Sequence, residues 1–368
     1  MKPIIDKTLC CGCGACAQRC PKRCIKMRVD EQGFLYPLVD KDKCINCGLC
    51  EKVCSVLNHG EPIQPLSCFA AINNDEKIRL ASSSGGVFTA FAEHVIAQGG
   101  VVFGAKFNEK WDVIHDYTET IGGLTAFRGS KYVESVIGDN YIRAERFLNQ
   151  NRKVLFTGTP CQIAGLKHFL HKEYDNLLCV EVACHGVPSP RVWKSYLQGK
   201  NVAEVNFRDK STGWKAYSVK IGKIRKYHDR NDYMNCFLAN FSLRPSCFNC
   251  QAKCGKSMAD ITLADFWGIS KIAPEIDDDK GTSAVVIWTI NGLNTFKPRT
   301  TQLQSISYEK VVNYNPSIII SSQRPDKYEY FWLDFSHNPL SAIEKYSKRN
   351  LPSLPLRIKQ LLIKIIKS

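Results

Sequence analysis

Short apolar blocks alternate with amphipathic stretches between residues 68 and 290, and this pattern predicts strands separated by helices. Apolar, β-branched runs typical of strands occupy 68–72, 101–107, 153–156, 177–183, 202–208, 217–224, 261–264 and 283–290. Helical spacing of apolar residues predicts helices at 86–97, 160–171 and 191–197. This alternation favours an α/β or α+β fold for residues 68–350, with the order of the strands left open.

The segments that flank this region follow other patterns. Residues 61–67 contain two prolines and no periodicity, so they are expected to form a linker. Residues 351–368 end in LPLRIKQLLIKIIKS, which places apolar residues on one helical face and basic residues opposite, with no acidic residue. Such a helix either docks on the protein's own core or rests on an anionic membrane surface.

No apolar run reaches the roughly 18–20 residues of a membrane-spanning helix, and the N-terminus lacks the apolar stretch of a signal peptide. A cytoplasmic location is therefore expected. A peripheral position at the inner face of the membrane is the alternative that the C-terminal helix leaves open. Because cytosolic thiols stay reduced, the 18 cysteines are interpreted as metal ligands rather than as disulfides.

Residues 10–20 and 44–54 each contain the spacing C-x2-C-x2-C-x3-C. This repeat is the signature of bacterial ferredoxins with two [4Fe–4S] clusters, in which the fourth cysteine of each run binds the other cluster. We therefore expect a ferredoxin domain over 1–60. The ligands expected for the first cluster are Cys10, Cys13, Cys16 and Cys54. Those expected for the second cluster are Cys20, Cys44, Cys47 and Cys50.

Two further cysteines, Cys11 and Cys24, fall outside this spacing and are interpreted as bystanders. A pair of zinc sites is the competing interpretation of the two runs. Each zinc ion would use four cysteines arranged as two C-x2-C halves, and neither run has that arrangement.

The charge balance bears on the class of partner. The chain has 50 Lys and Arg against 35 Asp and Glu, a formal net charge of +15. Three [4Fe–4S] clusters, at about −2 each with their thiolates, would lower this to about +9. No nucleic-acid motif is present, and the aromatic residues do not interleave with a basic stripe. We therefore expect an acidic partner or substrate rather than nucleic acid.

A third group of cysteines lies near residue 250, where Cys247, Cys250 and Cys254 follow the spacing C-x2-C-x3-C. An iron–sulfur or zinc site with four protein ligands needs one thiolate more. Cys161 lies in the first turn of a predicted helix, where the helix dipole favours a thiolate, and Cys184 ends a predicted strand. These two cysteines can supply the missing ligands to the 247–250 loop.

Two loops rich in small residues are candidates for binding an anion. Residues 81–91, ASSSGGVFTAF, place free backbone N–H groups at the start of a predicted helix. Taken alone, this loop is explained slightly better by an ordinary serine N-cap with glycines in a tight turn. Residues 127–135, FRGSKYVES, either hold a phosphate through the Gly129–Lys131 segment or form a basic surface turn.

Taken in order, these motifs resemble the beta-subunit family of coenzyme F-420-reducing hydrogenases and dehydrogenases. The resemblance spans nearly all of residues 68–325 and includes SSSGGVFTAF, RGSKYVES, GTPCQIAGL, CHGVP, FRDKSTGW, ADITLADFWGI after the C-x2-C pair, and GTSAVVIWT. It implies FAD held beside a [4Fe–4S] cluster. Together these cofactors would pass electrons between the ferredoxin clusters and a two-electron substrate.

The resemblance also implies roles for single residues. The implied ligands of the third cluster are Cys161, Cys184, Cys247 and Cys250. Two alternatives stay open: Cys254 with its two neighbours and one earlier cysteine, or a structural zinc on the same thiolates. The residues implied to hold FAD are Ser83, Ser84, Gly85, Gly86, Gly129, Ser130 and Lys131. The catalytic residue is unknown; the candidates are Lys131, beside the flavin ring, and His185, either a proton donor or a packing residue.

The function implied is that of an FAD- and [4Fe–4S]-dependent oxidoreductase. It would relay single electrons between a redox donor or acceptor protein and a small-molecule two-electron substrate. The deazaflavin coenzyme is one candidate substrate, but nothing in the sequence requires it. Two alternatives remain: an electron-transfer adaptor that feeds a partner enzyme without a productive flavin, and a zinc- and iron-bearing interaction protein.

Overall fold

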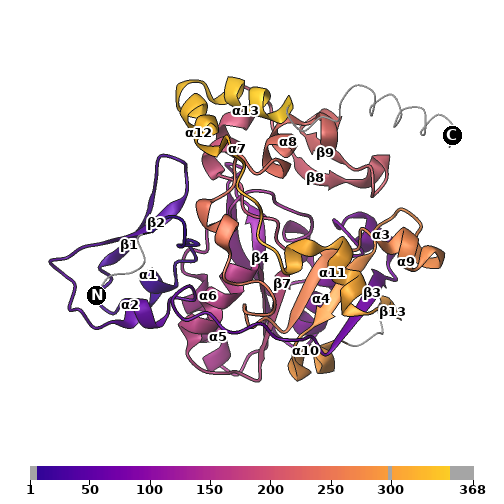
Figure 1. Cartoon of the computed structure of the whole chain (residues 1–368). Coiled ribbons are helices and arrows are strands. Elements are labelled where there is room, and N and C mark those ends of the chain that lie inside the picture. The colour runs from indigo at the N-terminus through magenta and orange to yellow at the C-terminus, as the bar shows by residue number, and fades with distance from the viewer. Residues whose placement is uncertain (1–5, 297–300, 349–368) are drawn as a thin grey trace.

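A computed structural model of the chain describes residues 6–296 and 301–348. Figure 1 shows a small N-terminal lobe, in indigo, beside a larger body that contains an extended sheet. The segment 351–368, predicted to form a basic helix, lies outside the described residues. Within the described ranges, no helix is long and apolar enough to cross a membrane.

The N-terminal lobe consists of one antiparallel hairpin and two short helices. Its elements are β1 (Ile25–Val29), β2 (Leu35–Val39), α1 (Ala15–Arg19) and α2 (Leu49–Lys52). Each helix follows a left-handed glycine, Gly14 at φ 76° and Gly48 at φ 75°, a conformation that residues with a Cβ rarely adopt. Because each glycine stands between the second and third cysteines of its run, the turn bends the chain where the ligands must converge.

The larger body is built on an eight-stranded mixed sheet. Its strands are β3 (Ser67–Asn73), β4 (Val101–Phe107), β5 (Val113–Thr118), β6 (Val154–Gly158), β7 (Leu177–Val182), β11 (Ile261–Asp265), β12 (Ser283–Ile287) and β13 (Thr301–Ser305). Their order across the sheet is β13-β3-β12-β11-β7-β6-β4-β5. The neighbours β11, β7, β6 and β4 run parallel, and antiparallel strands complete both edges.

Helices cover both faces of this sheet, because successive residues of a strand point to opposite sides. The main covering helices are α4 (Val87–Ala97), α5 (Asn140–Asn149) and α6 (Pro160–Leu170). Leu155 of β6 packs in a core with residues of α4, whereas its neighbour Phe156 packs with residues of α5 and α6. Strand β6 ends at Gly158 and helix α6 begins at Pro160. The first turn of α6 thus lies just beyond the carboxyl end of a parallel strand, where open α/β sheets usually bind ligands.

A second layer, at the top of Figure 1, surrounds a three-stranded antiparallel sheet. Its strands are β8 (Val205–Asp209), β9 (Ser218–Ile221) and β10 (Ile224–Tyr227). The helices of this layer are α7 (Pro190–Leu197), α8 (Asp232–Leu238), α12 (Tyr328–His337) and α13 (Pro339–Ser347). The remaining helices are α3 (Glu76–Leu80), α9 (Ile269–Ile272), α10 (Ile290–Thr295) and α11 (Tyr308–Tyr314). Aromatic side chains fill the core of the layer, with the Trp193 and Tyr233 rings 4.9 Å apart.

The mixed α/β class predicted from the sequence is confirmed, and three predicted strands differ clearly in their bounds: the run 202–208 begins as a strand only at Val205. The run 217–224 is not one strand, because Gly222 adopts φ 56° and reverses the chain between β9 and β10. The run 283–290 ends as a strand at Ile287. There the Thr289 side chain accepts a hydrogen bond from the Gly292 N–H and starts α10 instead.

Candidate functional site

Cysteines of the N-terminal lobe line two cavities, and each cavity receives cysteines from both runs. The first ferredoxin cavity is lined by all four cysteines predicted for the first cluster, Cys10, Cys13, Cys16 and Cys54. The second ferredoxin cavity is lined by all four predicted for the second cluster, Cys20, Cys44, Cys47 and Cys50. Four thiols around one cavity form the donor set of a [4Fe–4S] cluster, so these residues fit that group.

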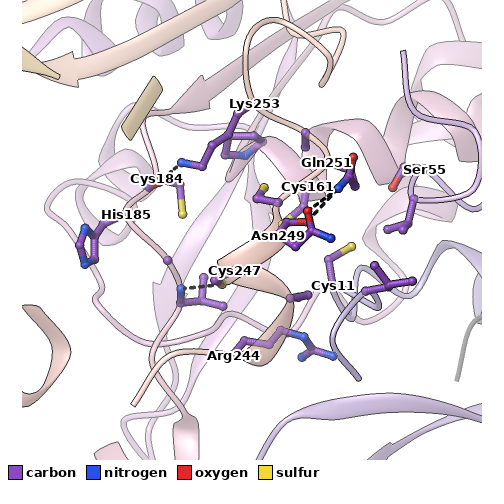
Figure 2. A pocket seen from close by; sticks show the side chains of 18 residues that line it. Cys11, Ser55, Cys161, Cys184, His185, Arg244, Cys247, Asn249, Gln251 and Lys253 are labelled. Atoms are coloured by element: carbon purple, nitrogen blue, oxygen red, sulfur yellow. Dashed lines mark hydrogen bonds between the residues drawn. The ribbon is translucent and has the colours of Figure 1, made fainter. Parts of the chain in front are cut away.

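A third cysteine cavity lies between the lobe and the larger body. The four cysteines implied by the family resemblance, Cys161, Cys184, Cys247 and Cys250, all line it. Figure 2 shows three of them around the cavity, together with Cys11 from the ferredoxin lobe. Burial raises the pKa of Cys184 to about 11, so iron would have to displace a proton from this thiol.

Local structure explains how these four cysteines reach one place. Cys161 is the second residue of α6, whose start is fixed by a capping box between Thr159 and Gln162. Cys184 follows the end of β7. Cys247 lies in a 3-10 turn that Cys250 follows directly, and the Sγ of Cys247 accepts a hydrogen bond of 3.4 Å from the Val187 N–H.

Cys254 occupies a different position. Its backbone is left-handed, at φ 60°, and its thiol donates to the Ile319 carbonyl at 3.5 Å rather than lining the third cysteine cavity. This geometry favours the set with Cys161 and Cys184 over the set that includes Cys254. The described residues contain no group of three or more His, Cys, Asp or Glu side chains close enough together to bind a single metal ion.

Sequence reasoning treated Cys11 as a bystander, but the structure places it between two candidate clusters. Cys11 lines both the first ferredoxin cavity and the third cysteine cavity. Hydrogen bonds with Cys13 and Cys161 lower the pKa of Cys11, and the same bonds raise the pKa values of both partners. The only signal in the sequence was the Cys10–Cys11 doublet, which the ferredoxin spacing does not require.

Cys24, the other presumed bystander, is buried in the wall of the second ferredoxin cavity. Its Sγ lies 3.3 Å from the Sγ of Cys20. This contact places a fifth thiol beside the four predicted ligands of that cavity.

Two buried cations that the sequence did not single out border the third cysteine cavity. The Arg244 side chain is 1% exposed and forms a 2.6 Å ion pair with Glu134. The Nζ of Lys253 donates to the Cys184 carbonyl at 2.7 Å and to the Ser317 carbonyl at 2.5 Å. Their positive charges offset the negative charge that four thiolates and a cluster would bring into this cavity.

A large cavity of about 550 Å³ opens beside the third cysteine cavity. Its volume falls within the range of cofactor sites in proteins. The predicted flavin residues that line it are Ser83, Ser84, Gly86, Gly129, Ser130 and Lys131. A hydrogen bond of 2.7 Å from the Ser130 N–H to Ser83 Oγ ties the two predicted loops together.

Gly85 is the one predicted flavin residue that does not line the large cavity. A Cβ on Gly85 would lie 2.3 Å from the Ala71 carbonyl oxygen, so the glycine permits close packing against β3. Gly129 differs, because its backbone is left-handed at φ 80° and no heavy atom lies within 4 Å of the position that a Cβ would take. Gly129 therefore leaves an open space in the wall of the large cavity.

The two candidate catalytic residues have structural contacts of their own. The Nζ of Lys131 donates to the carbonyls of Ala126 and Arg128, at 2.9 and 2.8 Å, and burial lowers its pKa to about 7. The Nε2 of His185 lies 2.6 Å from Asn240 Oδ1, and burial lowers the pKa of this ring. The Lys131 ammonium thus stabilises the loop to which it belongs through hydrogen bonds to two of its carbonyls. His185 instead lines both the third cysteine cavity and the large cavity.

Arg208 is a cavity residue that sequence reasoning missed. Its guanidinium donates to Asp265 at 2.6 Å and lies over the rings of Tyr217 and Trp267. Its Nε is buried and has no hydrogen-bond partner among the described residues. A buried, unpaired donor in this wall suits a cofactor with phosphate or carbonyl oxygens.

Two family models match parts of the chain. Residues 9–57 match the 4Fe-4S dicluster domain, and residues 151–309 match the family described as the C terminus of the coenzyme F420 hydrogenase/dehydrogenase beta subunit. The F420-reducing [NiFe] hydrogenase complex from Methanosarcina barkeri, solved as a xenon derivative, is a similar structure. It is 16% identical, with 78% of this chain and 91% of that chain covered and a TM-score of 0.48.

No curated protein matches the chain. The family suggested by the sequence motifs is confirmed over 151–309, whereas the motifs at 81–91 and 127–135 lie outside the matched residues. The chain thus combines a match to a 4Fe-4S dicluster domain over residues 9–57 with a match to the C terminus of the coenzyme F420 hydrogenase/dehydrogenase beta subunit over residues 151–309.

Proposed function

We propose that this chain is an oxidoreductase that depends on FAD and three [4Fe–4S] clusters. It exchanges single electrons with a redox protein and two electrons with a small-molecule substrate. FAD supplies the conversion between one-electron and two-electron chemistry when it is bound. The domains, the third cluster, the flavin and the site residues predicted above are all parts of this proposal.

The observation that carries the proposal is the continuity of the four cavities. Cys50 lines both the second and the first ferredoxin cavities. Cys11, Ser55 and Val56 line both the first ferredoxin cavity and the third cysteine cavity. The segment from Cys184 to Val187 lines both the third cysteine cavity and the large cavity. Shared walls join the four cavities in a single series, which is the arrangement that electron relay requires.

The chain's own residues have defined tasks in this series. Negative charge in the third cysteine cavity would be stabilised in two ways. The Val187 N–H donates a hydrogen bond to Cys247 Sγ, and the buried side chains of Arg244 and Lys253 carry positive charge beside the cavity. Hydrogen bonds to sulfur and nearby charge are the means by which proteins set the potential of a cluster. In the large cavity, Ser83 and Arg208 would contact the polar groups of the flavin, and the ring-lined wall would exclude water.

The test is the stoichiometry of cofactors in anaerobically purified protein. About twelve irons and one FAD per chain are expected, because three clusters contain four irons each. About eight irons with no flavin would contradict the proposal and leave a dicluster electron carrier. About twelve irons without flavin would favour the adaptor that feeds a separate enzyme.

A further inference from the structure

The second ferredoxin cavity is the terminal cavity of the series, since it shares lining residues with the first ferredoxin cavity alone among the other three. Of the 18 cysteines, all of which lie in the described part of the chain, Cys47 alone is exposed. Ile45, which also lines this cavity, has 56% of its surface exposed. A single electron from outside therefore has direct access to the cluster held here.

The first ferredoxin cavity is covered by the larger body. Helix α6 packs so closely on Cys13 that a Cβ on Gly165 would lie 3.0 Å from its Sγ. On another side, a Cβ on Gly12 would lie 2.7 Å from Nη1 of Arg244. Because these contacts occupy its surroundings, a protein partner can approach the series more closely at the second cavity than at the first.

Two turns beside the second cavity carry exposed cations. One turn is closed by a 3.0 Å hydrogen bond from the Arg23 N–H to the Cys20 carbonyl and presents Lys22 and Arg23. The other is closed by a 3.3 Å hydrogen bond from the Cys44 N–H to the Lys41 carbonyl. Lys22 itself lines the second cavity, so the first turn adjoins Ile45 and Cys47 directly.

The basic side chains of these turns stand beside a few acidic residues. Lys43 is paired with Asp40 at 3.0 Å, and Asp42 and Glu51 also lie close to the second cavity in sequence. Lys22, Arg23 and Lys41 have no acidic partner among the described residues. Lys22, Arg23 and Lys41 thus place three exposed cations around an apolar centre at Ile45.

We propose that this face, formed by Lys22, Arg23, Lys41, Ile45 and Cys47, is the docking surface for an acidic protein that carries single electrons. An apolar centre with a charged rim is the usual anatomy of a transient protein interface, and complementary charge accelerates the encounter. Electron-transfer encounters also bury little area, so a small face suffices. In each encounter the carrier is oxidised by one electron and the dicluster domain is reduced by one, without any bond forming or breaking.

The inference deepens the proposed function, and it rests on that function only for the presence of a cluster at Cys47. The test uses full-length, anaerobically purified protein and a reduced, acidic plant-type [2Fe–2S] ferredoxin as the probe. The variant is Lys22→Glu/Arg23→Glu/Lys41→Glu. Its matched control is Lys110→Glu/Lys223→Glu/Lys310→Glu, which changes the net charge equally at three exposed lysines elsewhere on the chain.

The rate of electron transfer from the probe is followed by stopped-flow absorbance at low and high salt. We expect the face variant to react about tenfold more slowly at low salt, with the difference shrinking as salt screens the charges. The control variant should stay close to the parent protein. Reduced methyl viologen, a small cation, should reduce the face variant at least as fast as the parent, which excludes loss of the cluster or of its driving force.

Equal slowing in the two triple variants would overturn the inference, because net charge alone would then explain the rates. An unchanged rate in the face variant would overturn it as well. Iron and flavin contents are measured on the same samples. If they show about eight irons and no flavin, the proposed function is wrong. The docking surface is then still decided by the electron-transfer rates of the face and control variants, because both clusters of the dicluster domain are present.

Discussion

The Nε of Arg244 donates a 2.9 Å hydrogen bond to the carbonyl oxygen of Cys10, a residue 234 positions earlier in the chain. The same guanidinium donates to the Leu35 carbonyl at 2.7 Å and to Glu134 at 2.6 Å. One buried cation thus joins the ferredoxin lobe to the larger body. This junction holds the first ferredoxin cavity against the third cysteine cavity.

Replacing Arg244 by Met should reduce the free energy of unfolding by about 3–5 kcal/mol, because it leaves the Glu134 carboxylate buried without its partner. Urea unfolding followed by tryptophan fluorescence under anaerobic conditions measures this loss. Arg143→Met is the control, since Arg143 forms partly exposed pairs with Asp139 and Asp116 and should cost less than about 1 kcal/mol. Equal losses in the two variants would contradict the role assigned to Arg244.

The choice of ligands for the third cluster makes a separate prediction. Cys184→Ser should lower the iron content from about twelve to about eight per chain, because one lost thiolate releases a four-iron cluster. Cys254→Ser should leave the iron content unchanged, since the thiol of Cys254 does not line the third cysteine cavity. Iron analysis and the visible spectrum of each variant decide between the ligand set with Cys184 and the ligand set with Cys254. Loss of iron in the Cys254 variant would restore the alternative ligand set.

Features of the fold and of the cysteine cavities that depend on a short stretch of sequence could be predicted from the sequence alone. The spacing of each ferredoxin run identified the cysteines of two cavities, because a short loop must wrap three of them around one cluster. The contacts of Arg244 and Cys11 could not be predicted, because they depend on how the lobe docks against the larger body. The strand order is another such case: β12 lies between β3 and β11, so Ser283 pairs with Ala71 from a distant part of the chain.

Cys11 should influence electron transfer rather than cluster assembly. Cys11→Ala removes the thiol that lines both the first ferredoxin cavity and the third cysteine cavity, so electrons should pass several-fold more slowly from the dicluster domain to the third cluster. The iron content should stay at about twelve, and Cys11→Ser, which keeps a hydrogen-bonding group, should restore most of the rate. Rapid freeze-quench EPR after mixing with a reductant measures the order in which the clusters are reduced. A loss of about four irons would instead identify Cys11 as a ligand.

Glu181 makes the stability of the fold depend on pH. Its side chain is 3% exposed, and Oε1 accepts a hydrogen bond from the Thr262 hydroxyl at 2.6 Å. Burial raises the pKa of Glu181 to about 7 in the folded protein, above its ordinary value of 4.5. The folded state therefore binds this proton more tightly than the unfolded state, and stability should fall as the pH rises from about 4.5 to 7.

Glu181→Gln should remove this dependence, which amounts to about 3 kcal/mol between the two ends of the window. Unfolding free energies measured at several pH values between 5.5 and 7.5 give the slope for each protein. Glu61→Gln, at an exposed position, is the control and should keep the slope of the parent. An unchanged slope in Glu181→Gln would mean that the carboxyl is not protonated on folding.

The flavin assignment can be tested at Gly129 without disturbing the clusters. Gly129 and Gly199 both have left-handed backbones, at φ 80° and 74°, and a Cβ on either would meet no heavy atom within 4 Å. A leucine at either position therefore adds similar backbone strain, about 1–2 kcal/mol, but only Gly129 lines the large cavity. Gly129→Leu should lower the FAD content at least tenfold while about twelve irons remain, because its side chain would occupy part of the cofactor's space. Gly199→Leu should retain both. If the two variants bind FAD equally well, the loop around Gly129 does not form the flavin site, and the large cavity must be assigned to another ligand.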